Sequence, residues 1–386
     1  MKFIILSDSY PPDMKSGAFL IQTLAQYLSS KGHQITVVSF SDEVLEDHSR
    51  EKDGGITLIR LRIPAFKYNL TKRALVEITY SFKIISYLKK QHLDFDGVIC
   101  YSPSIFFGYA VRYIKKRWSI KCYLIVRDLF PDWAVSIGIL RKGPIYYFFK
   151  YFERVMLKAA DFVGVEAKAN IEHCKNIVND REEIVENLLN WYPPIQIKES
   201  KPPEFIHKDK FNLIYGGNLG YAQNFMNFLQ DLKSVEDQKF RLLIVGSGTE
   251  RSKIEDFINS HNMDILLLPS MPRDNYLEIV KFSDAGLIVI NRDIVANNYP
   301  GKSFDYMSYG KPIFAYLNQD NEFGIMIDEL NFGYYPNNHG IESFIETFTK
   351  MISNHDDRIE KGENAKEVVE REFSVENAGE IILRKF

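Results

Sequence analysis

The sequence contains little of several residue types that mark particular classes of protein. Its three cysteines, Cys100, Cys122 and Cys174, are few for 386 residues and form no C-x-x-C pair. This sparse set predicts reduced thiols in a cytoplasmic protein, and it argues against a disulfide framework or a cysteine-based zinc site. No D-x-D follows an expected strand, so we expect no metal-binding cluster and no bound metal.

Long apolar runs are also missing. No window holds the roughly 18 apolar residues that a membrane-spanning helix requires. The N-terminal run MKFIIL is broken at Ser7-Asp8, too early for a signal peptide. The formal net charge is only −3, which gives a nucleic-acid partner no support. We therefore expect a cytoplasmic chain that neither spans a membrane nor binds nucleic acid.

The small net charge hides a strong polarity along the chain. Residues 67–158 contain 17 Lys and Arg against 6 Asp and Glu, a local balance of +11, which leaves −14 for the remainder. Such asymmetry suggests that the first half of the protein faces an anionic partner.

Apolar runs of strand length recur along the chain, and longer segments of helical period separate them. In the first half the expected strands are residues 3–6, 35–40, 97–100, 122–126 and 162–165. In the second half they are residues 211–218, 241–248, 265–270, 285–290 and 312–317. This alternation is typical of parallel sheets covered by helices on both faces.

Residues 186–204 interrupt the alternation with four prolines and neither a helical nor a strand period. We expect an interdomain linker at 191–204, between domains of residues 1–190 and 205–373. Ser374 is the expected N-cap of a final helix. The predicted fold is α/β, with two Rossmann-like, doubly wound domains facing across a cleft. Ligands should bind where the carboxyl ends of the strands meet.

Glycine-rich loops follow expected strands in both halves. Gly17 opens the first helix, Gly217 and Asn218 end one strand of the second domain, and Gly246 ends the next. Glycine at these points lets a ligand approach backbone amides, and a tight turn without a ligand is the alternative for each loop. Three such loops at strand ends are better evidence together than any one of them. There is no G-x-G-x-x-G, which argues against a nicotinamide or flavin cofactor.

The stretch NNYPGKSFDYMSYGKPIFAYL, residues 297–317, predicts a short helix with Ser303 as its N-cap and Gly310 as the residue that ends it. An anion at this helix start would meet the amides of Gly301 and its neighbours, the positive end of the dipole and the Lys302 ammonium. Asp305 follows in the helix. It either accepts hydrogen bonds from a ligand hydroxyl or only complements the dipole.

The segment VRDLFPDW follows an expected strand, so its charged residues should lie at the ligand-binding edge of the sheet. Asp128 could orient a hydroxyl, and Arg127 could pair with Asp128 or with a phosphate. Asp132 is a further candidate for the chemistry. The alternative is a buried Arg–Asp pair that only fixes the loop.

Two segments of the basic half, residues 67–90 and 141–158, combine aromatic and cationic side chains. The first places Leu75, Phe82 and Leu88 along one helical face. Helices of this kind suit an anionic membrane surface, whereas the alternative is two core helices with solvated lysines. Because both lie in the basic half, we expect peripheral contact with the inner face of the cell membrane.

Taken together, these segments resemble the retaining glycosyltransferases of the GT-B fold, family four, in particular the branch that adds amino or deoxy sugars to bacterial surface polysaccharides. The matching segments are SYPPDMKSG, LAQYLSSKGHQITVVS, VRDLFPDWAVSIG, GGNLGYAQN, LLIVGSGTE and PGKSFDYMSYGKPI. The resemblance implies a nucleotide-diphospho-sugar bound mainly by the second domain and an acceptor bound by the first. It also implies that the final helix, 374–386, packs back onto the first domain.

The resemblance carries over to individual residues only in part. Asp305 stands where the second glutamate of the E-x7-E motif binds the ribose. Asn297 stands where the first glutamate would touch the donor sugar, so that contact is altered or lost. The Arg and Lys that often hold the diphosphate are replaced here by Asn218 and Gln223. Lys302 is then the expected cation for the diphosphate.

The resemblance also implies how transfer would proceed. Gly17 would supply amides to the diphosphate, and Met271 would lie near the base. Retaining transfer requires no protein nucleophile, since the leaving diphosphate oxygen can take the acceptor proton on the same face. Positioning and charge stabilisation are then sufficient, and Lys302 with helix amides makes a metal or other cofactor dispensable.

We therefore expect a glycosyltransferase that moves a sugar from a nucleoside diphosphate, UDP, to a polyprenyl-diphosphate-linked saccharide in the synthesis of O-antigen, capsule or exopolysaccharide. One alternative is a GT-B-fold UDP-sugar 2-epimerase, but the glycine loops contain no histidine to serve it. Another is a non-catalytic nucleotide-sugar-binding subunit, which the replacements at Asn218, Gln223 and Asn297 leave open.

Overall fold

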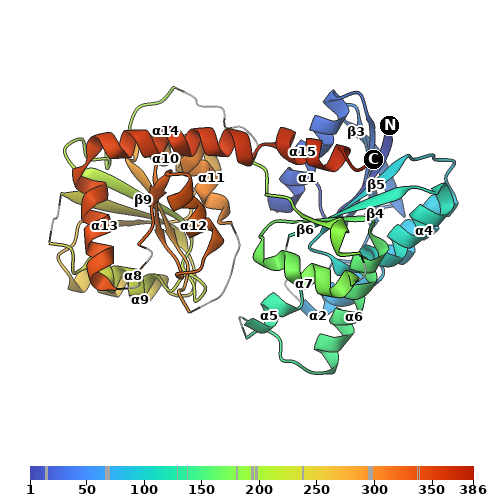
Figure 1. The fold of residues 1–386 in the computed structure, drawn as a ribbon, viewed down its shortest axis with the longest axis horizontal. Helices are drawn as coiled ribbons and strands as arrows, with labels where there is room; N and C mark the ends of the chain where they lie inside the picture. The colour runs from blue at the N-terminus through green and yellow to red at the C-terminus, as the bar shows by residue number, and fades with distance from the viewer. Residues whose placement is uncertain are drawn as a thin grey trace. The chain divides into compact units, whose positions relative to one another are not determined.

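The computed structural model forms two compact units (Figure 1). Unit 1 comprises residues 1–193 and 374–386, and unit 2 comprises residues 194–373. The structure describes all residues except 14–15, 66–69, 128, 137, 180, 193–194, 196–198, 237–238, 294–298, 337 and 339. Two predicted site residues, Asp128 and Asn297, therefore lie outside the described residues.

Unit 1 contains an eight-stranded sheet in the order β3-β4-β2-β1-β5-β6-β7-β8. β3 pairs antiparallel with β4, and the other neighbours pair in parallel. The strands are β1 (Lys2–Leu6), β2 (Gln34–Ser41), β3 (His48–Asp53), β4 (Ile56–Arg62), β5 (Gly97–Ser102), β6 (Lys121–Val126), β7 (Phe162–Val165) and β8 (Val185–Asn187). Because the chain moves outward from β1 first through β2 and later through β5, the strand order reverses between β1 and β5.

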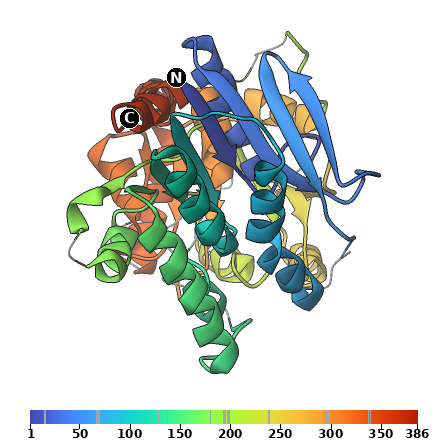
Figure 2. The same cartoon turned by 90° about the vertical axis from the view of Figure 1, so that its right-hand side faces the viewer.

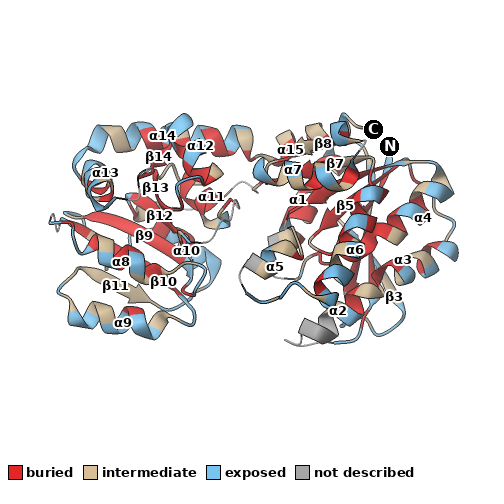
Figure 3. Ribbon diagram, turned by 60° about the horizontal axis from the view of Figure 1, so that its bottom comes forward, coloured by how far each residue is buried: buried red, intermediate tan, exposed pale blue. Residues whose placement is uncertain are grey.

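Helices cover both faces of this sheet (Figure 2). They are α1 (Ser16–Ser30), α2 (Leu70–Ile78), α3 (Tyr80–Lys89), α4 (Gly108–Trp118), α5 (Asp132–Ser136), α6 (Pro144–Ala159), α7 (Ala169–Val178) and α15 (Val375–Leu383), with short 3-10 turns η1 (Ile105–Phe107) and η2 (Glu182–Ile184). Alternate residues of β1 supply the two cores, since Phe3 and Ile5 pack into one and Ile4 and Leu6 into the other. The sheet is consequently buried on both sides (Figure 3).

Unit 2 contains a six-stranded parallel sheet in the order β11-β10-β9-β12-β13-β14. Its strands are β9 (Phe211–Asn218), β10 (Phe240–Ser247), β11 (Ile265–Leu268), β12 (Ala285–Val289), β13 (Ile313–Tyr316) and β14 (Gly333–Tyr334). Its helices are α8 (Phe225–Leu232), α9 (Arg251–Ser260), α10 (Arg273–Phe282), α11 (Gly301–Ser308), α12 (Glu322–Glu329), α13 (Ile341–Ser353) and α14 (His355–Glu372). The strand order reverses between β9 and β12, which makes their carboxyl ends the expected ligand site of this unit.

The predicted α/β class and all ten predicted strands are confirmed. Sequence reasoning missed β3, β4, β8 and β14. The missed edge strand β3 has the charged sequence HSREKD, which gives no apolar signal. Trp191, the first residue of the expected linker, is instead fully buried in unit 1, where its Nε1 donates to the Leu20 carbonyl at 2.9 Å.

The end of the chain packs onto unit 1. Ser374 caps α15 as expected, since its Oγ accepts a hydrogen bond from the Asn377 amide at 3.1 Å. The Tyr27 hydroxyl of α1 donates to Glu380 of α15 at 2.7 Å. Gly379 lies directly over the Tyr27 ring, so that a Cβ there would be 2.3 Å from Cε1. Close packing against Tyr27 therefore explains why residue 379 is a glycine.

None of the helices formed by the described residues combines the length and the hydrophobicity that crossing a bilayer requires.

We predict that Gly379→Val separates α15 from α1, because the valine side chain would overlap the Tyr27 ring. The free energy of unfolding should fall by about 1–3 kcal/mol, measured by thermal or urea denaturation. Gly143→Val is the matched control, since a Cβ at Gly143 meets nothing closer than 4.0 Å. Equal stability of both variants and the wild type would contradict this packing.

Candidate functional site

The carboxyl ends of β9 and β12 place the predicted donor residues of unit 2 in one region. Gly217 and Asn218 are the last two residues of β9, and α11 is the helix that comes after β12. α11 lies against β12, and the Tyr306 hydroxyl of α11 accepts a hydrogen bond from the Gly216 amide at 3.1 Å. Tyr306 thus fixes the helix to both strands that flank the reversal of strand order.

The start of α11 differs from the sequence prediction. Pro300, not Ser303, is the N-cap residue, and the helix begins at Gly301. The Pro300 carbonyl accepts hydrogen bonds from both the amide and the hydroxyl of Ser303, at 2.9 and 2.6 Å. The predicted N-cap was wrong because Ser303 already lies in the first turn. This places Lys302 within the first turn as well.

The end of α11 agrees with the prediction. Gly310 has φ +65°, in the left-handed region that glycine tolerates best. Its amide donates to the Met307 carbonyl, and the Lys311 amide donates to the Tyr306 carbonyl, both at 2.9 Å. This pair of hydrogen bonds is the Schellman motif.

Lys302 reaches back from α11 to the end of β9. Its Nζ lies 4.0 Å from the centre of the Tyr215 ring, and a Cβ added to Gly217 would be 2.8 Å from Nζ. Burial lowers the pKa of Lys302 to about 7. Among the described residues, no carboxylate oxygen lies within 4 Å of Nζ. The side chain therefore titrates near neutral pH, and its ammonium form lies against an aromatic ring without a carboxylate of the described residues beside it.

The glycines around Lys302 allow the backbone and this side chain to approach closely. Gly217 has φ +147°, and any side chain there would meet Nζ. A Cβ at Gly246 would be 2.0 Å from the Gly217 carbonyl oxygen. Packing alone thus accounts for Gly246, whereas a Cβ at Gly301 would meet nothing within 4 Å. The predicted ligand contacts of these glycines remain predictions.

The two uncharged residues that replace the expected Arg and Lys lie together. Asn218 Nδ2 donates to Gln223 Oε1 at 3.2 Å, and Asn218 is exposed. Neither residue brings a positive charge to the end of β9. Among the described residues, Lys302 is the basic side chain that reaches this point.

Asp305 forms an ion pair that the sequence did not reveal. Its Oδ1 accepts a hydrogen bond from Arg273 Nη2 at 2.6 Å. Burial raises the pKa of Asp305 to about 6, although Arg273 partly opposes the rise. Arg273 is the first residue of α10, two residues after the half-buried Met271. A basic residue at the start of the helix that follows β11 was the available signal for this contact.

In unit 1, Arg127 pairs with a residue that sequence reasoning missed. Arg127 follows β6 and Glu166 follows β7, and the two strands are neighbours. Arg127 Nη2 donates to Glu166 Oε1 at 2.7 Å, and both side chains are buried. The suggested partner, Asp128, lies outside the described residues. The signal in the sequence was the acidic residue directly after the strand FVGV.

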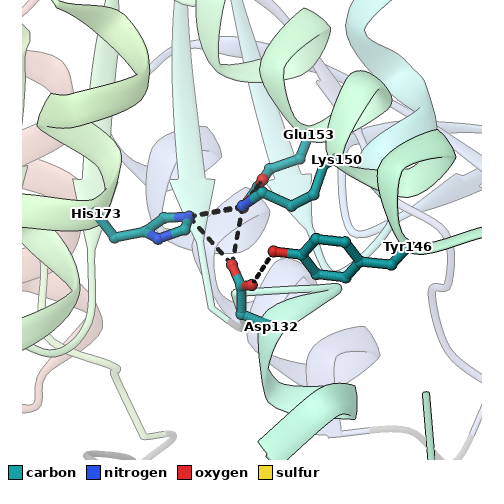
Figure 4. A network of polar contacts seen from close by, with 5 residues as sticks. All are labelled: Asp132, Tyr146, Lys150, Glu153 and His173. Carbon is teal, nitrogen blue, oxygen red and sulfur yellow. Dashed lines mark hydrogen bonds and ion pairs between the residues drawn. The ribbon is translucent and has the colours of Figure 1, made fainter. Parts of the chain in front are cut away.

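Asp132 belongs to a polar network of α5, α6 and α7 (Figure 4). It accepts hydrogen bonds from the Tyr146 hydroxyl at 2.7 Å and from Lys150 Nζ at 2.9 Å. Lys150 also forms an ion pair with Glu153 and lies 3.3 Å from His173 Nε2. Partial burial favours a higher pKa for Asp132, but the bonds from Lys150 and Tyr146 outweigh it and lower the pKa.

We expected no metal-binding cluster from the sequence, but this network contains three side chains that could bind a metal ion. Ligand atoms of Asp132, Glu153 and His173 lie within 4.8 Å of one another, close enough to share a metal ion. In the structure the ammonium group of Lys150 lies among them (Figure 4). Lys150 thus supplies the positive charge that the carboxylates of Asp132 and Glu153 require.

Gly17, predicted to offer amides to a phosphate, is the second residue of α1. A Cβ there would be 2.9 Å from Cε1 of Tyr101, the penultimate residue of β5. Packing against Tyr101 is therefore a sufficient reason for this glycine, and its ligand contact remains a prediction.

Comparisons with known proteins agree with this architecture. Residues 18–179 match the family model described as Glycosyltransferase Family 4. The chain is 20% identical over 337 residues to WcaI of Escherichia coli strain K12, a protein named for a glycosyl transferase step of colanic acid biosynthesis, and the match covers 80% of this chain and 82% of WcaI.

Solved structures with the same fold extend over the whole chain. WaaG, a glycosyltransferase involved in lipopolysaccharide biosynthesis, superposes with a TM-score of 0.65 at 15% identity, covering 98% of this chain and 99% of WaaG. Anabaena HepE, solved in complex with UDP and glucose, has a TM-score of 0.64 at 14% identity and covers 100% of this chain and 99% of its own. Residues 18–179 are therefore similar to glycosyltransferase family 4, and the chain is a glycosyltransferase with the GT-B fold.

Proposed function

We propose that this glycosyltransferase moves a sugar, with retention of configuration, from a UDP-sugar to a polyprenyl-diphosphate-linked saccharide in the synthesis of a bacterial surface polysaccharide. The observation that carries the proposal is Lys302, a basic side chain at the reversal of strand order in unit 2 that has no carboxylate of the described residues beside it. The names of WcaI and WaaG, which refer to colanic acid and to lipopolysaccharide, support the polysaccharide product.

The donor would bind to unit 2 with its diphosphate at Lys302. A diphosphate bound at this point would accept a charge-assisted hydrogen bond from Lys302 Nζ. It would also lie in the favourable field of the α11 N-terminus. HepE, which has the same fold, was solved with UDP bound, and this supports a uridine nucleotide as the donor. Because Lys302 and helix amides provide the positive charge, the proposed transfer needs no metal.

The nucleoside would lie between α11 and the start of α10. Asp305 would accept hydrogen bonds from the ribose hydroxyls while Arg273 donates to both of its carboxylate oxygens, at 2.6 and 3.4 Å. Met271, half-buried just before α10, would contact the base. The donor-sugar contact assigned to Asn297 is part of the same proposal.

Departure of the diphosphate is the step that this site would accelerate. Negative charge develops on the leaving phosphate oxygen as the glycosidic bond breaks, and a preorganised ammonium group stabilises that charge without reorganising solvent. The same oxygen would take the proton of the incoming acceptor hydroxyl. Unit 1 would hold the acceptor, with Arg127 and Asp128 at the carboxyl edge of its sheet.

The surface of α6 supports a lipid-linked acceptor. Ile145, Tyr147, Phe148 and Tyr151 expose 63, 65, 44 and 53% of their surface, and Arg141, Lys142, Arg154 and Lys158 are exposed around them. α4 packs between α6 and α3, where Phe82 exposes 64%. Of the expected apolar face of residues 67–90, Leu88 is buried, whereas Leu75 and Phe82 are exposed. Exposed aromatic and basic side chains together fit an anionic membrane surface at the inner face of the cell membrane.

We predict that Lys302→Ala weakens binding of UDP by about ten- to hundredfold and leaves binding of uridine nearly unchanged, because the lysine meets only the diphosphate. Titration calorimetry with both ligands measures the difference. Arg358→Ala serves as a control, since this cation of unit 2 lies over Phe211, at the amino end of β9. Equal losses for UDP and uridine would show that Lys302 does not touch phosphate. Wild-type protein that binds neither would contradict a uridine donor.

We predict that UDP binding weakens as the pH rises above about 7. The pKa of Lys302 is lowered to about 7 in the free protein, and a bound phosphate favours the ammonium form, so above this pH binding must take up a proton. The Kd should rise by up to about tenfold per pH unit between pH 7 and 9. Lys302→Met should remove this dependence, and a wild-type Kd that stays flat over that range would contradict it.

We predict that Tyr147→Glu combined with Phe148→Glu abolishes flotation with anionic liposomes, because two negative charges replace two exposed aromatic side chains of α6. Wild-type binding should also decrease with added salt. Ile359→Glu in α14 is the matched control, since Ile359 is 49% exposed but lies in unit 2. Wild-type protein that fails to float at low salt would contradict the membrane contact.

A further inference from the structure

Arg127 and Glu166 form a buried ion pair at the carboxyl edge of the unit 1 sheet. Val126 of β6 and Val165 of β7 are register partners, and each pair member directly follows one of them. Arg127 is 8% exposed and Glu166 is 5% exposed. Asn187 Nδ2 donates to the carbonyls of Val165 and Glu166, at 3.0 and 2.8 Å, and so fixes the backbone that carries the glutamate.

Only one edge of the Arg127 guanidinium is used within this cluster. Nη2 donates to Glu166, but Nη1 is buried and has no hydrogen-bond partner among the described residues. Buried donors in folded proteins are nearly always paired, and leaving one unpaired is unfavourable. A guanidinium group that is held on one side and unpaired on the other is therefore preorganised to donate to a ligand.

The charge of the pair indicates which ligand group it suits. Glu166 neutralises Arg127 at 2.7 Å, so the pair offers a strong hydrogen bond but little net attraction for an anion. Lys302 has the opposite character, because no carboxylate oxygen of the described residues lies within 4 Å of its Nζ. The diphosphate would therefore prefer Lys302, whereas an uncharged sugar oxygen suits Arg127.

We propose that Arg127 Nη1 donates to an uncharged oxygen of a sugar, a hydroxyl or an amide carbonyl, and that Glu166 is the residue that positions Arg127 for this contact. The inference rests on the proposed function, since it presumes a sugar substrate. The oxygen belongs either to the transferred sugar or to the acceptor saccharide, and the two sources are distinguished by experiment.

The test compares a charge-neutral double variant, Arg127→Met with Glu166→Gln, to the wild type. Calorimetry with UDP, UDP-glucose and UDP-N-acetylglucosamine gives the contribution of the sugar as the ratio of the Kd for UDP to that for each UDP-sugar. A transfer assay with polyprenyl-diphosphate-linked saccharides gives the KM of the acceptor. The double variant Arg241→Met with Asp264→Asn, which removes an arginine–carboxylate pair of the same length, 2.7 Å, in unit 2, controls for loss of stability.

We expect the double variant to bind UDP as the wild type does. We also expect one of two losses of ten- to hundredfold: either the ratio of the Kd for UDP to that for a UDP-sugar decreases, or kcat/KM decreases because the acceptor KM rises. The first result assigns the contact to the transferred sugar and the second to the acceptor. Weaker binding of UDP itself would overturn the inference, because it would place a phosphate at Arg127. So would unchanged sugar discrimination together with an unchanged acceptor KM. Failure of the wild type to bind UDP would overturn the proposed function, and the inference that rests on it would fall with it.

Glu166→Gln alone provides a readout that a purely structural role would not change. It leaves the guanidinium charge uncompensated, so we expect the variant to become sensitive to inhibition by inorganic phosphate, which should affect the wild type and the double variant at least tenfold less. Thermal unfolding verifies that the variant is folded, and Glu166→Asp, which keeps the charge, should restore resistance to phosphate. A folded Glu166→Gln variant that is no more sensitive than the wild type would contradict the proposed role of charge.

Discussion

The proposed function depends on one cationic side chain, Lys302, which has no carboxylate oxygen of the described residues within 4 Å of its Nζ. Lys302 extends from the first turn of α11 to the end of β9, where its Nζ lies 4.0 Å from the centre of the Tyr215 ring. Burial of an unpaired charge is unfavourable, and the lowered pKa of Lys302 reflects this. Gly217 accommodates the side chain, and Tyr306 fixes the helix that carries it. The surrounding fold thus holds Lys302 at the point where we propose that the diphosphate binds.

The other charged candidate residues of each unit are compensated within that unit. Arg127 is neutralised by Glu166, Asp305 pairs with Arg273, and Lys150 lies among Asp132, Glu153 and His173. This contrast separates two kinds of recognition. An uncompensated cation attracts a phosphate, whereas a neutral pair offers hydrogen bonds that suit sugar hydroxyls. The Asp132 network also ties α5, which follows the Arg127 loop, to the buried side of α6. The exposed side of α6 is the proposed membrane surface.

Much of the fold could be predicted from the sequence, because buried parallel strands produce apolar runs that are distinct from helical periodicity. Lys302 and Gly310 were also recognisable, since helix ends have local sequence signals. Ser303 was misassigned because the helix begins two residues earlier, at Gly301, after a Pro300 N-cap that makes no side-chain hydrogen bond. The pairs Arg127–Glu166 and Arg273–Asp305 could not be predicted. Their members are 39 and 32 residues apart, and only the packing of neighbouring strands and helices brings them together.

The most direct test of the central claim is a crystal structure of the protein with UDP. The account predicts a diphosphate oxygen at roughly 2.7–2.9 Å from Lys302 Nζ, with the ribose hydroxyls at Asp305. Diphosphate bound elsewhere, with Lys302 Nζ still against Tyr215 and without a phosphate contact, would contradict it.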